Sequence, residues 1–132
     1  MARGVIHHIE IYVSDLEKSL TFWEWLLEEL GYEAYQEWEQ GKSYKLDNSY
    51  LVFVQTEEAY LHIPYHRKGT GLNHLAFYGE SREYVDSLTK QLRKKGINIL
   101  YDDRHPYAGG DHYYAVFFED PDRIKVEVVA PS

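Results

Sequence analysis

Three side chains that can bind a metal ion fall in three predicted strands of this 132-residue chain, at His8, His74 and Glu127. Two neutral imidazoles and one carboxylate form a common ligand set for a divalent transition metal and leave positions open for substrate and water. The chain also contains seven His residues, so such a trio can arise by chance among surface histidines of half-exposed strands. The residue types alone leave both a metal site and a set of surface histidines open.

Strand periodicity places these three side chains on the same kind of face. Successive side chains of a β-strand point to opposite faces, and the odd-numbered residues of the predicted strand 5–13 are mostly apolar. That apolar face suits packing under a helix, so the face that carries His8 is turned away from the helix. The predicted strands around His74 and Glu127 show the same alternation, which predicts that all three side chains lie on the sheet face opposite the helices.

The elements that would hold these strands occur twice in the chain. The first half predicts a strand, a helix and three more strands: 5–13, 16–30, 32–38, 43–46 and 50–55. The second half repeats this order: a strand at 72–78, a helix between Ser81 and Gly96, and strands at 97–101, 113–119 and 124–129. We therefore predict an α+β fold in which one domain, 1–132, consists of two βαβββ modules, 4–60 and 71–131, with the helices outside a curved, mixed, eight-stranded sheet.

Capping residues mark the helix boundaries. Ser14 or Asp15 suits the N-cap of the first helix, and Ser81 suits that of the second. Gly31 and Gly96 stand where a glycine commonly follows the end of a helix.

Composition restricts the possible partners. The chain has 14 basic and 22 acidic residues, a net charge of -8, which argues against binding a nucleic-acid backbone. It has no cysteine, which excludes disulfides and thiol catalysis, and no apolar run approaches the roughly 18 residues that span a bilayer. The start leaves no room for a signal peptide, so we expect a cytoplasmic protein. The 13 Tyr residues suit a cavity that binds a small molecule.

Three segments carry a family resemblance. The opening I-H-H-I-E-I-Y-V-S-D-L-E-K-S, the middle segment G-L-N-H-L-A-F-Y and the ending E-D-P-D-R-I-K-V-E-V-V resemble signatures of the vicinal oxygen chelate superfamily, in the right order. That superfamily includes glyoxalase I, bleomycin-binding proteins, fosfomycin-resistance proteins, methylmalonyl-CoA epimerase and extradiol dioxygenases. The resemblance implies two βαβββ modules around a metal cavity, with His8, His74 and Glu127 holding a divalent ion such as Zn, Ni, Mn or Fe. It also implies a homodimer.

The chain departs from individual branches of that superfamily. Resemblance to glyoxalase I would require a Glu ligand late in strand 50–55, where Phe53 or Gln55 stands; Gln55 could ligate through its amide oxygen. Extradiol dioxygenases carry a Tyr where this chain has Phe117, and Arg123 replaces the usual Gly of the D-P-D-G turn. The fosfomycin-resistance proteins share the ligand set and the short length.

Further site candidates share the predicted cavity face. Glu10 could act as a general base beside Glu127, or it could pair with Lys125. Tyr12 and Tyr78 are candidates for binding substrate on the same face.

Loops supply the remaining candidates. Arg67, in the linker between the modules, could hold a substrate carboxylate, or it could belong to a solvated linker. The long loop 102–111 carries His105, and we expect His112 and Tyr114 beside it to line the cavity mouth and bind substrate.

Two functions follow from these expectations. The first is a metal-dependent, glyoxalase-like lyase or isomerase that stabilises an enediolate of a small oxygen-chelating substrate. The alternative is a small-molecule or antibiotic binding protein of the bleomycin- or fosfomycin-resistance type, without general turnover. In the predicted homodimer, the candidates for subunit contacts are Trp23, Trp25 and Trp38.

Overall fold

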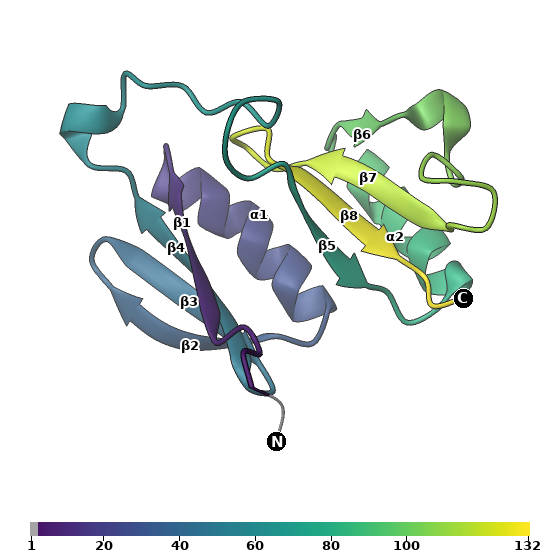
Figure 1. Ribbon diagram of the computed structural model, residues 1–132, viewed down its shortest axis with the longest axis horizontal. Coiled ribbons are helices and arrows are strands. Elements are labelled where there is room, and N and C mark those ends of the chain that lie inside the picture. Colours follow the sequence, from purple (N-terminus) through teal and green to yellow (C-terminus); the bar gives the residue numbers. More distant parts are fainter. Residues whose placement is uncertain (1–2) are drawn as a thin grey trace. The chain divides into compact units, whose positions relative to one another are not determined.

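The computed structural model describes residues 3–132, which form two compact units that meet in sequence between Pro64 and Tyr65. Each unit contains one strand, one helix and three further strands, in that order (Figure 1). This order confirms the predicted α+β fold class with its repeated βαβββ pattern. The eight strands of residues 3–132 form two four-stranded sheets, one in each unit, and not the single eight-stranded sheet that we predicted.

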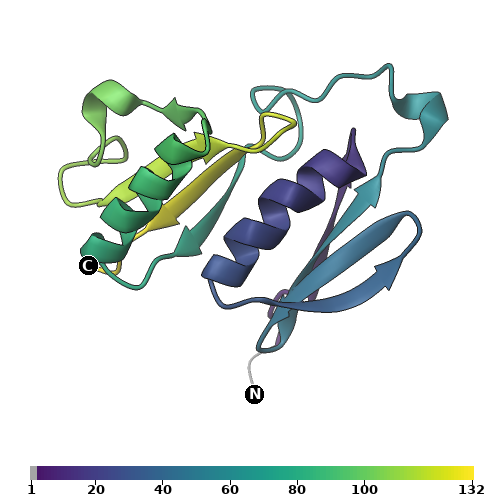
Figure 2. The same cartoon turned by 180° about the vertical axis from the view of Figure 1, so that it is seen from behind.

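The first unit is a mixed sheet covered on one face by a helix. Its elements are β1 (His8–Val13), α1 (Leu16–Glu29), β2 (Glu33–Trp38), β3 (Gly41–Leu46), β4 (Ser49–Gln55) and the 3-10 helix η1 (Glu58–Tyr60). The strand order is β1-β4-β3-β2, with β1 parallel to β4 and the other neighbours antiparallel. Figure 2 shows α1 lying across one face of this sheet.

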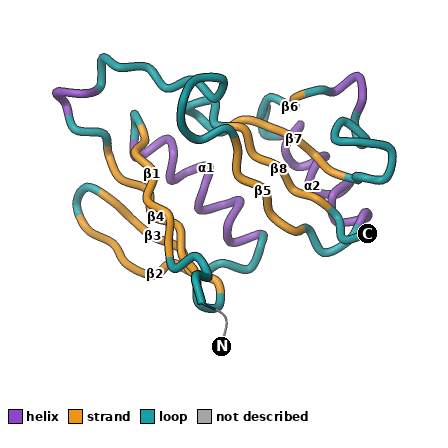
Figure 3. Tube along the Cα trace, viewed as in Figure 1, coloured by secondary structure: helices purple, strands orange, loops and turns teal. Residues whose placement is uncertain are grey.

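The second unit has the same topology. Its elements are β5 (His74–Tyr78), α2 (Arg82–Lys94), β6 (Ile99–Leu100), the 3-10 helix η2 (Asp102–Arg104), β7 (Ala115–Glu119) and β8 (Lys125–Val129). The strand order is β5-β8-β7-β6 (Figure 3). The first pair, β5 and β8, is again parallel. We call the face of each sheet that is turned away from its helix the open face.

The helix boundaries follow the capping signals. Asp15, rather than Ser14, is the N-cap of α1, because its Oδ1 accepts a hydrogen bond from the Lys18 N–H at 3.2 Å. The hydroxyl of Ser81 accepts from the Tyr84 N–H at 3.0 Å at the start of α2. Gly31 has a φ of +97°, a conformation that side chains disfavour and that ends α1.

Trp23 lies in the core of the first unit. Its side chain is 0% exposed, and its ring stacks on Phe53 of β4 at a centroid distance of 4.9 Å. The expectation that Trp23 forms a subunit contact is therefore wrong, because helix periodicity turns it toward the unit's own sheet. Trp38 is 44% exposed and stays a candidate for such a contact.

Gln55 stabilises the start of α1. Its amide oxygen accepts a hydrogen bond from the Leu16 N–H at 2.9 Å, and its Nε2 donates to the Ser14 carbonyl at 2.9 Å. The pairing of β1 with β4 places Phe53 and Gln55 beside Ile11 and Val13, on the face that packs against α1. The suggestion that Gln55 ligates a metal ion is therefore wrong, since the register turns its side chain away from the open face and its amide binds the start of α1.

No helix among residues 3–132 is both long enough and apolar enough to cross a membrane.

Candidate functional site

His74 and Glu127 meet on the open face of the second unit. They lie on the neighbouring parallel strands β5 and β8, where Ala76 pairs with Glu127 and His74 pairs with Lys125. The His74 Nε2 atom is 3.5 Å from Glu127 Oε1, and the Glu127 side chain is only 4% exposed. The strands β5 and β8 thus place one imidazole nitrogen and one carboxylate oxygen close together on the open face.

Tyr113 completes the surroundings of Glu127. Its hydroxyl donates a hydrogen bond to Glu127 Oε2, the carboxylate oxygen that does not face His74. This bond raises the pKa of Tyr113 to about 12, so the phenol stays a protonated donor throughout the neutral range.

The sequence predicted Tyr114 as a substrate-binding residue, and Tyr113 was missed. Strand alternation could have indicated Tyr113, because it lies four residues before Phe117, and Phe117 pairs with Glu127 on the open face. The hydroxyl of Tyr114 instead donates to Asp86 on α2 at 2.5 Å, on the other side of the sheet from Glu127.

The Tyr114–Asp86 bond predicts a defined pH response. It raises the pKa of Tyr114 from an ordinary 10.0 to about 12 in the folded protein. A raised folded-state pKa means that this contribution to stability is complete below pH 10.0 and is lost as the pH rises through about 12. Absorbance titration of tyrosinate should show that Tyr114→Phe removes a group that ionises near pH 12. Loss of a group that ionises near pH 10.0 would contradict the assignment.

A pocket of about 400 Å³ adjoins this site. Tyr78 and His112, two predicted substrate-binding residues, line it together with Tyr113. Ala76 and Phe77 of β5 supply part of its apolar wall, and the chain from Val129 to Ser132 supplies more of that wall. Tyr113 thus lines the pocket and also donates a hydrogen bond to the Glu127 carboxylate.

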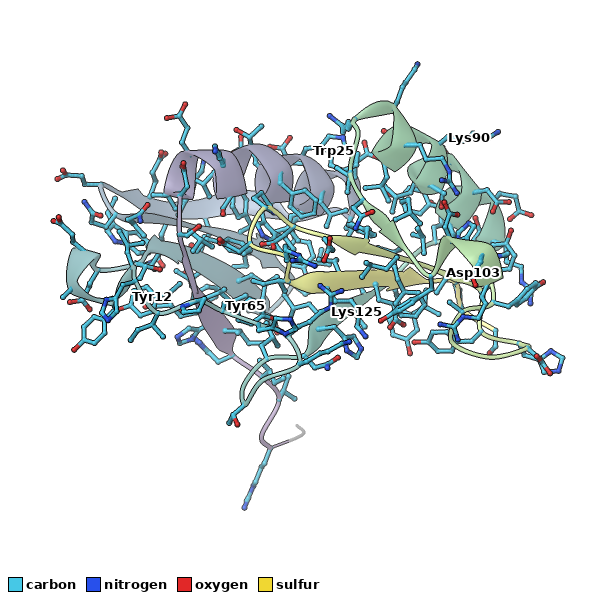
Figure 4. All side chains as sticks on the ribbon, turned by 90° about the horizontal axis from the view of Figure 1, so that it is seen from above. Tyr12, Trp25, Tyr65, Lys90, Asp103 and Lys125 are labelled. Carbon is cyan, nitrogen blue, oxygen red and sulfur yellow. The ribbon has the colours of Figure 1, made fainter. Side chains whose placement is uncertain are left out.

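Lys125 lies on the same open face (Figure 4). Its ammonium contacts the Tyr101 hydroxyl at 3.3 Å and lies over the Tyr101 and Phe117 rings, at 5.5 and 6.0 Å from their centroids. The lysine is therefore held by aromatic groups of its own unit.

Arg67 is engaged within the second unit. Its guanidinium binds Glu119 Oε2 at 2.5 Å and the Arg123 carbonyl at 3.0 Å, and its side chain is 15% exposed. Arg123 has a φ of +67°, the conformation for which glycine is usual in this turn, and its Nε also contacts Glu119 at 3.4 Å. These contacts attach the linker to the turn between β7 and β8.

His8 lies on the open face of the first unit, as the alternation predicted. Its ring stacks on Tyr50 at 4.7 Å, and its Nδ1 is 2.8 Å from the Nδ1 of His7. Glu10 and Tyr12 are exposed on the same face.

Tyr12 borders a second pocket, in the first unit. Its hydroxyl donates to Glu57 Oε2 at 3.3 Å, a contact that raises the pKa of Tyr12. Gln40, Glu58 and Leu61 contribute to the lining of this pocket, and Figure 4 shows Tyr12 on the side of its sheet away from α1.

The metal-ligand trio spans both units, with His8 in the first and the His74–Glu127 pair in the second. No group of three or more His, Asp or Glu side chains placed to hold a metal ion is found among residues 3–132. That His8 binds the same metal ion as His74 and Glu127 stays a prediction.

Comparison with known proteins identifies the family. The sequence model of the Glyoxalase/Bleomycin resistance protein/Dioxygenase superfamily matches residues 5–128. The uncharacterized protein YqjT of Bacillus subtilis (strain 168) is 61% identical over 127 residues, which cover 96% of this chain and 99% of that protein. Glutathione transferase FosA of Serratia marcescens is 28% identical over 123 residues, 93% of this chain and 78% of FosA.

A solved structure confirms the fold. The crystal structure of a candidate glyoxalase from Bacillus halodurans has a TM-score of 0.97 to this chain at 62% identity, covering 98% of this chain and 97% of that one. The family model and these relatives extend over nearly the whole sequence, and the solved structure has the fold described above. The chain belongs to the Glyoxalase/Bleomycin resistance protein/Dioxygenase superfamily.

Proposed function

We propose that this protein is a metal-dependent, glyoxalase-like enzyme, a lyase or isomerase of small oxygen-chelating substrates. The ligands in this proposal are His74 and Glu127 of the second unit together with His8 of the first. The observation that carries it is the approach of His74 Nε2 to Glu127 Oε1, 3.5 Å apart on an open sheet face.

The chemistry of the pair fits a divalent ion. Two ligand atoms that each lie about 2.1 Å from one ion are about 3 to 3.5 Å apart, and the observed separation falls at the upper end of this range. A carboxylate as buried as Glu127 needs compensating partners, because burying an unpaired charge is unfavourable. A cation beside Oε1 and the Tyr113 hydroxyl on Oε2 would satisfy both oxygens.

The residues of the chain then have distinct roles. A bound divalent ion would polarise a substrate carbonyl and stabilise the developing enediolate. Tyr113 holds the Glu127 carboxylate in place, and the pocket beside it receives the substrate between Tyr78 and His112. Glu10, exposed on the open face of the first unit, is the candidate base that accepts the substrate's α-proton.

The first test of this proposal is metal binding. Metal-free protein titrated with Ni²⁺, Zn²⁺ or Mn²⁺ in a calorimeter should bind about one ion per chain, and His8→Ala and His74→Ala should each weaken binding at least about tenfold. His62→Ala, at an exposed linker position, is the matched control and should bind like the wild type. His7→Ala is unsuitable as a control, because the His7 ring contacts the His8 ring.

The second test addresses the reaction. An enzyme that forms an enediolate exchanges the α-proton of a hydroxyketone for deuterium in D₂O, which proton NMR detects without knowledge of the natural substrate. The metal-loaded wild type should catalyse this exchange, and Glu10→Gln should abolish it while retaining metal affinity. Exchange at the wild-type rate in Glu10→Gln would remove Glu10 from the mechanism.

The second candidate function is a binding or resistance protein of the bleomycin or fosfomycin type. The family model that matches residues 5–128 includes bleomycin resistance proteins, which supports this candidate. If the purified protein contains less than about one-tenth of a metal ion per chain, and added Ni²⁺, Zn²⁺ or Mn²⁺ does not bind to it, the result would support this alternative over the enzyme.

We also propose that the protein forms a homodimer, with Trp38 and Trp25 as candidates for the contact. Light scattering at micromolar concentration should give a mass of twice 15.6 kDa, and a mass of 15.6 kDa would overturn this proposal.

A further inference from the structure

We infer that Asn73 is a positioning residue that sets the tautomer of His74 and directs the unprotonated Nε2 of that ring at the metal position beside Glu127. The role of His74 as a metal ligand in this inference rests on the proposed function. The position of the proton on the His74 ring is a property of the metal-free protein and can be measured without a metal ion.

Two hydrogen bonds determine the orientation of the Asn73 amide. Its Nδ2 donates to the Arg67 carbonyl at 3.2 Å, so the other end of the amide is the oxygen. That oxygen, Oδ1, lies 2.7 Å from His74 Nδ1. An amide oxygen can only accept, and therefore Nδ1 of His74 carries the proton of the neutral ring.

The Arg67 carbonyl is itself held in place. The Arg67 side chain is bound by Glu119 and by the Arg123 carbonyl, which fixes the linker against the turn that precedes β8. The Tyr65 hydroxyl donates to the Leu72 carbonyl at 2.8 Å, a hydrogen bond that joins the two ends of the segment 65–72. Asn73 is therefore oriented by a backbone atom of an anchored segment.

The consequence for His74 is chemical. With its proton on Nδ1, the ring presents the lone pair of Nε2 to Glu127 Oε1 at 3.5 Å, so that two acceptors face each other. A proton or a metal cation between them relieves this repulsion. Asn73 thus favours a ligand pair at this position over a simple hydrogen bond between a neutral His74 and Glu127.

The first unit repeats this arrangement. His7, the residue immediately before His8, places its Nδ1 2.8 Å from the Nδ1 of that ring. The positions match across the repeat, because residues 7 and 8 correspond to residues 73 and 74 at the same spacing. In both modules the residue before the predicted ligand contacts Nδ1 of the ligand's ring, and a partner on the nitrogen that does not bind metal is common among metal-binding histidines.

The experiment is a measurement of the His74 tautomer in the metal-free protein. Long-range ¹H–¹⁵N NMR spectra at about pH 9, where imidazoles are neutral, distinguish a proton on Nδ1 from one on Nε2. We expect the Nδ1–H form in the wild type, a shift toward Nε2–H in Asn73→Ala, and retention of Nδ1–H in Asn73→Asp, which keeps an acceptor oxygen. Asn48→Ala, at an exposed turn in the first unit, should leave the His74 signals unchanged.

Metal affinity provides the second readout. Asn73→Ala should weaken metal binding about tenfold or more, with Asn73→Asp close to the wild type, because the lost partner no longer fixes the ring. An Nε2–H tautomer in the wild type, or one unchanged in Asn73→Ala, would overturn the inference. If the wild type binds no metal, the proposed function fails, and the tautomer of Asn73→Ala alone decides the inference.

Discussion

Replacing Glu127 with glutamine is expected to weaken divalent metal binding by at least about a hundredfold, a larger loss than the replacement of a residue that only supports a ligand. The neutral amide keeps the shape of the side chain and an oxygen that can accept from Tyr113, but it removes the negative charge that attracts the ion. The measurement is calorimetric titration of the metal-free variant with Ni²⁺, Zn²⁺ or Mn²⁺.

The stability of Glu127→Gln should move in the opposite direction to its metal affinity. The Glu127 side chain is 4% exposed, and removing a buried charge relieves its desolvation, so the metal-free variant should unfold at an equal or higher temperature than the wild type. Glu83→Gln, on the exposed start of α2, is the control for a change of one charge. Unchanged metal affinity in Glu127→Gln would exclude this carboxylate as a ligand.

Replacing Trp23 with alanine is expected to lower the free energy of unfolding by about 3–5 kcal/mol, the usual range for removing a large buried aromatic side chain. Trp23 is 0% exposed, stacks on Phe53 and meets the edge of Phe22 at 5.1 Å, so its loss leaves a cavity between α1 and its sheet. Urea unfolding of the metal-free protein, followed by circular dichroism, gives the difference.

Tyr60 is the matched control for this prediction. It is 58% exposed on η1, so Tyr60→Ala should change the free energy of unfolding by about 1 kcal/mol or less. A similar loss for both variants would mean that Trp23 is not a specific part of the core.

Much of the fold was predictable because its determinants are local. The hydrophobic alternation of the first strand and the helix spacing of the following segment predicted β1 and α1 to within three residues at each end. The matching positions of His8 and His74 revealed the repeat, and the same alternation correctly predicted that both lie on open faces. Such patterns depend on which residues are neighbours along one strand or helix, and the sequence displays these neighbours directly.

The site was only partly predictable because its details depend on pairing between strands. Tyr113 and Tyr114 are adjacent and of the same type, and only the register of β7 against β8 decides that Tyr113 reaches Glu127. Gln55 resembled a ligand in the sequence, but the register of β4 against β1 directs its amide to the start of α1. A shift of one residue in either register would exchange these outcomes.

The amino-acid sequence by itself determined the family, through the three segments that resemble its signatures. Its periodicity determined the repeated βαβββ order and the faces on which the candidate ligands lie. Only the tertiary structure decided which side chains meet. It brought Glu119 of β7 to Arg67 of the linker, across a sequence separation of 52 residues that no local pattern spans. The physical reason is that hydrogen bonds and ion pairs depend on distances of a few ångströms, which long-range strand pairing sets and sequence spacing does not.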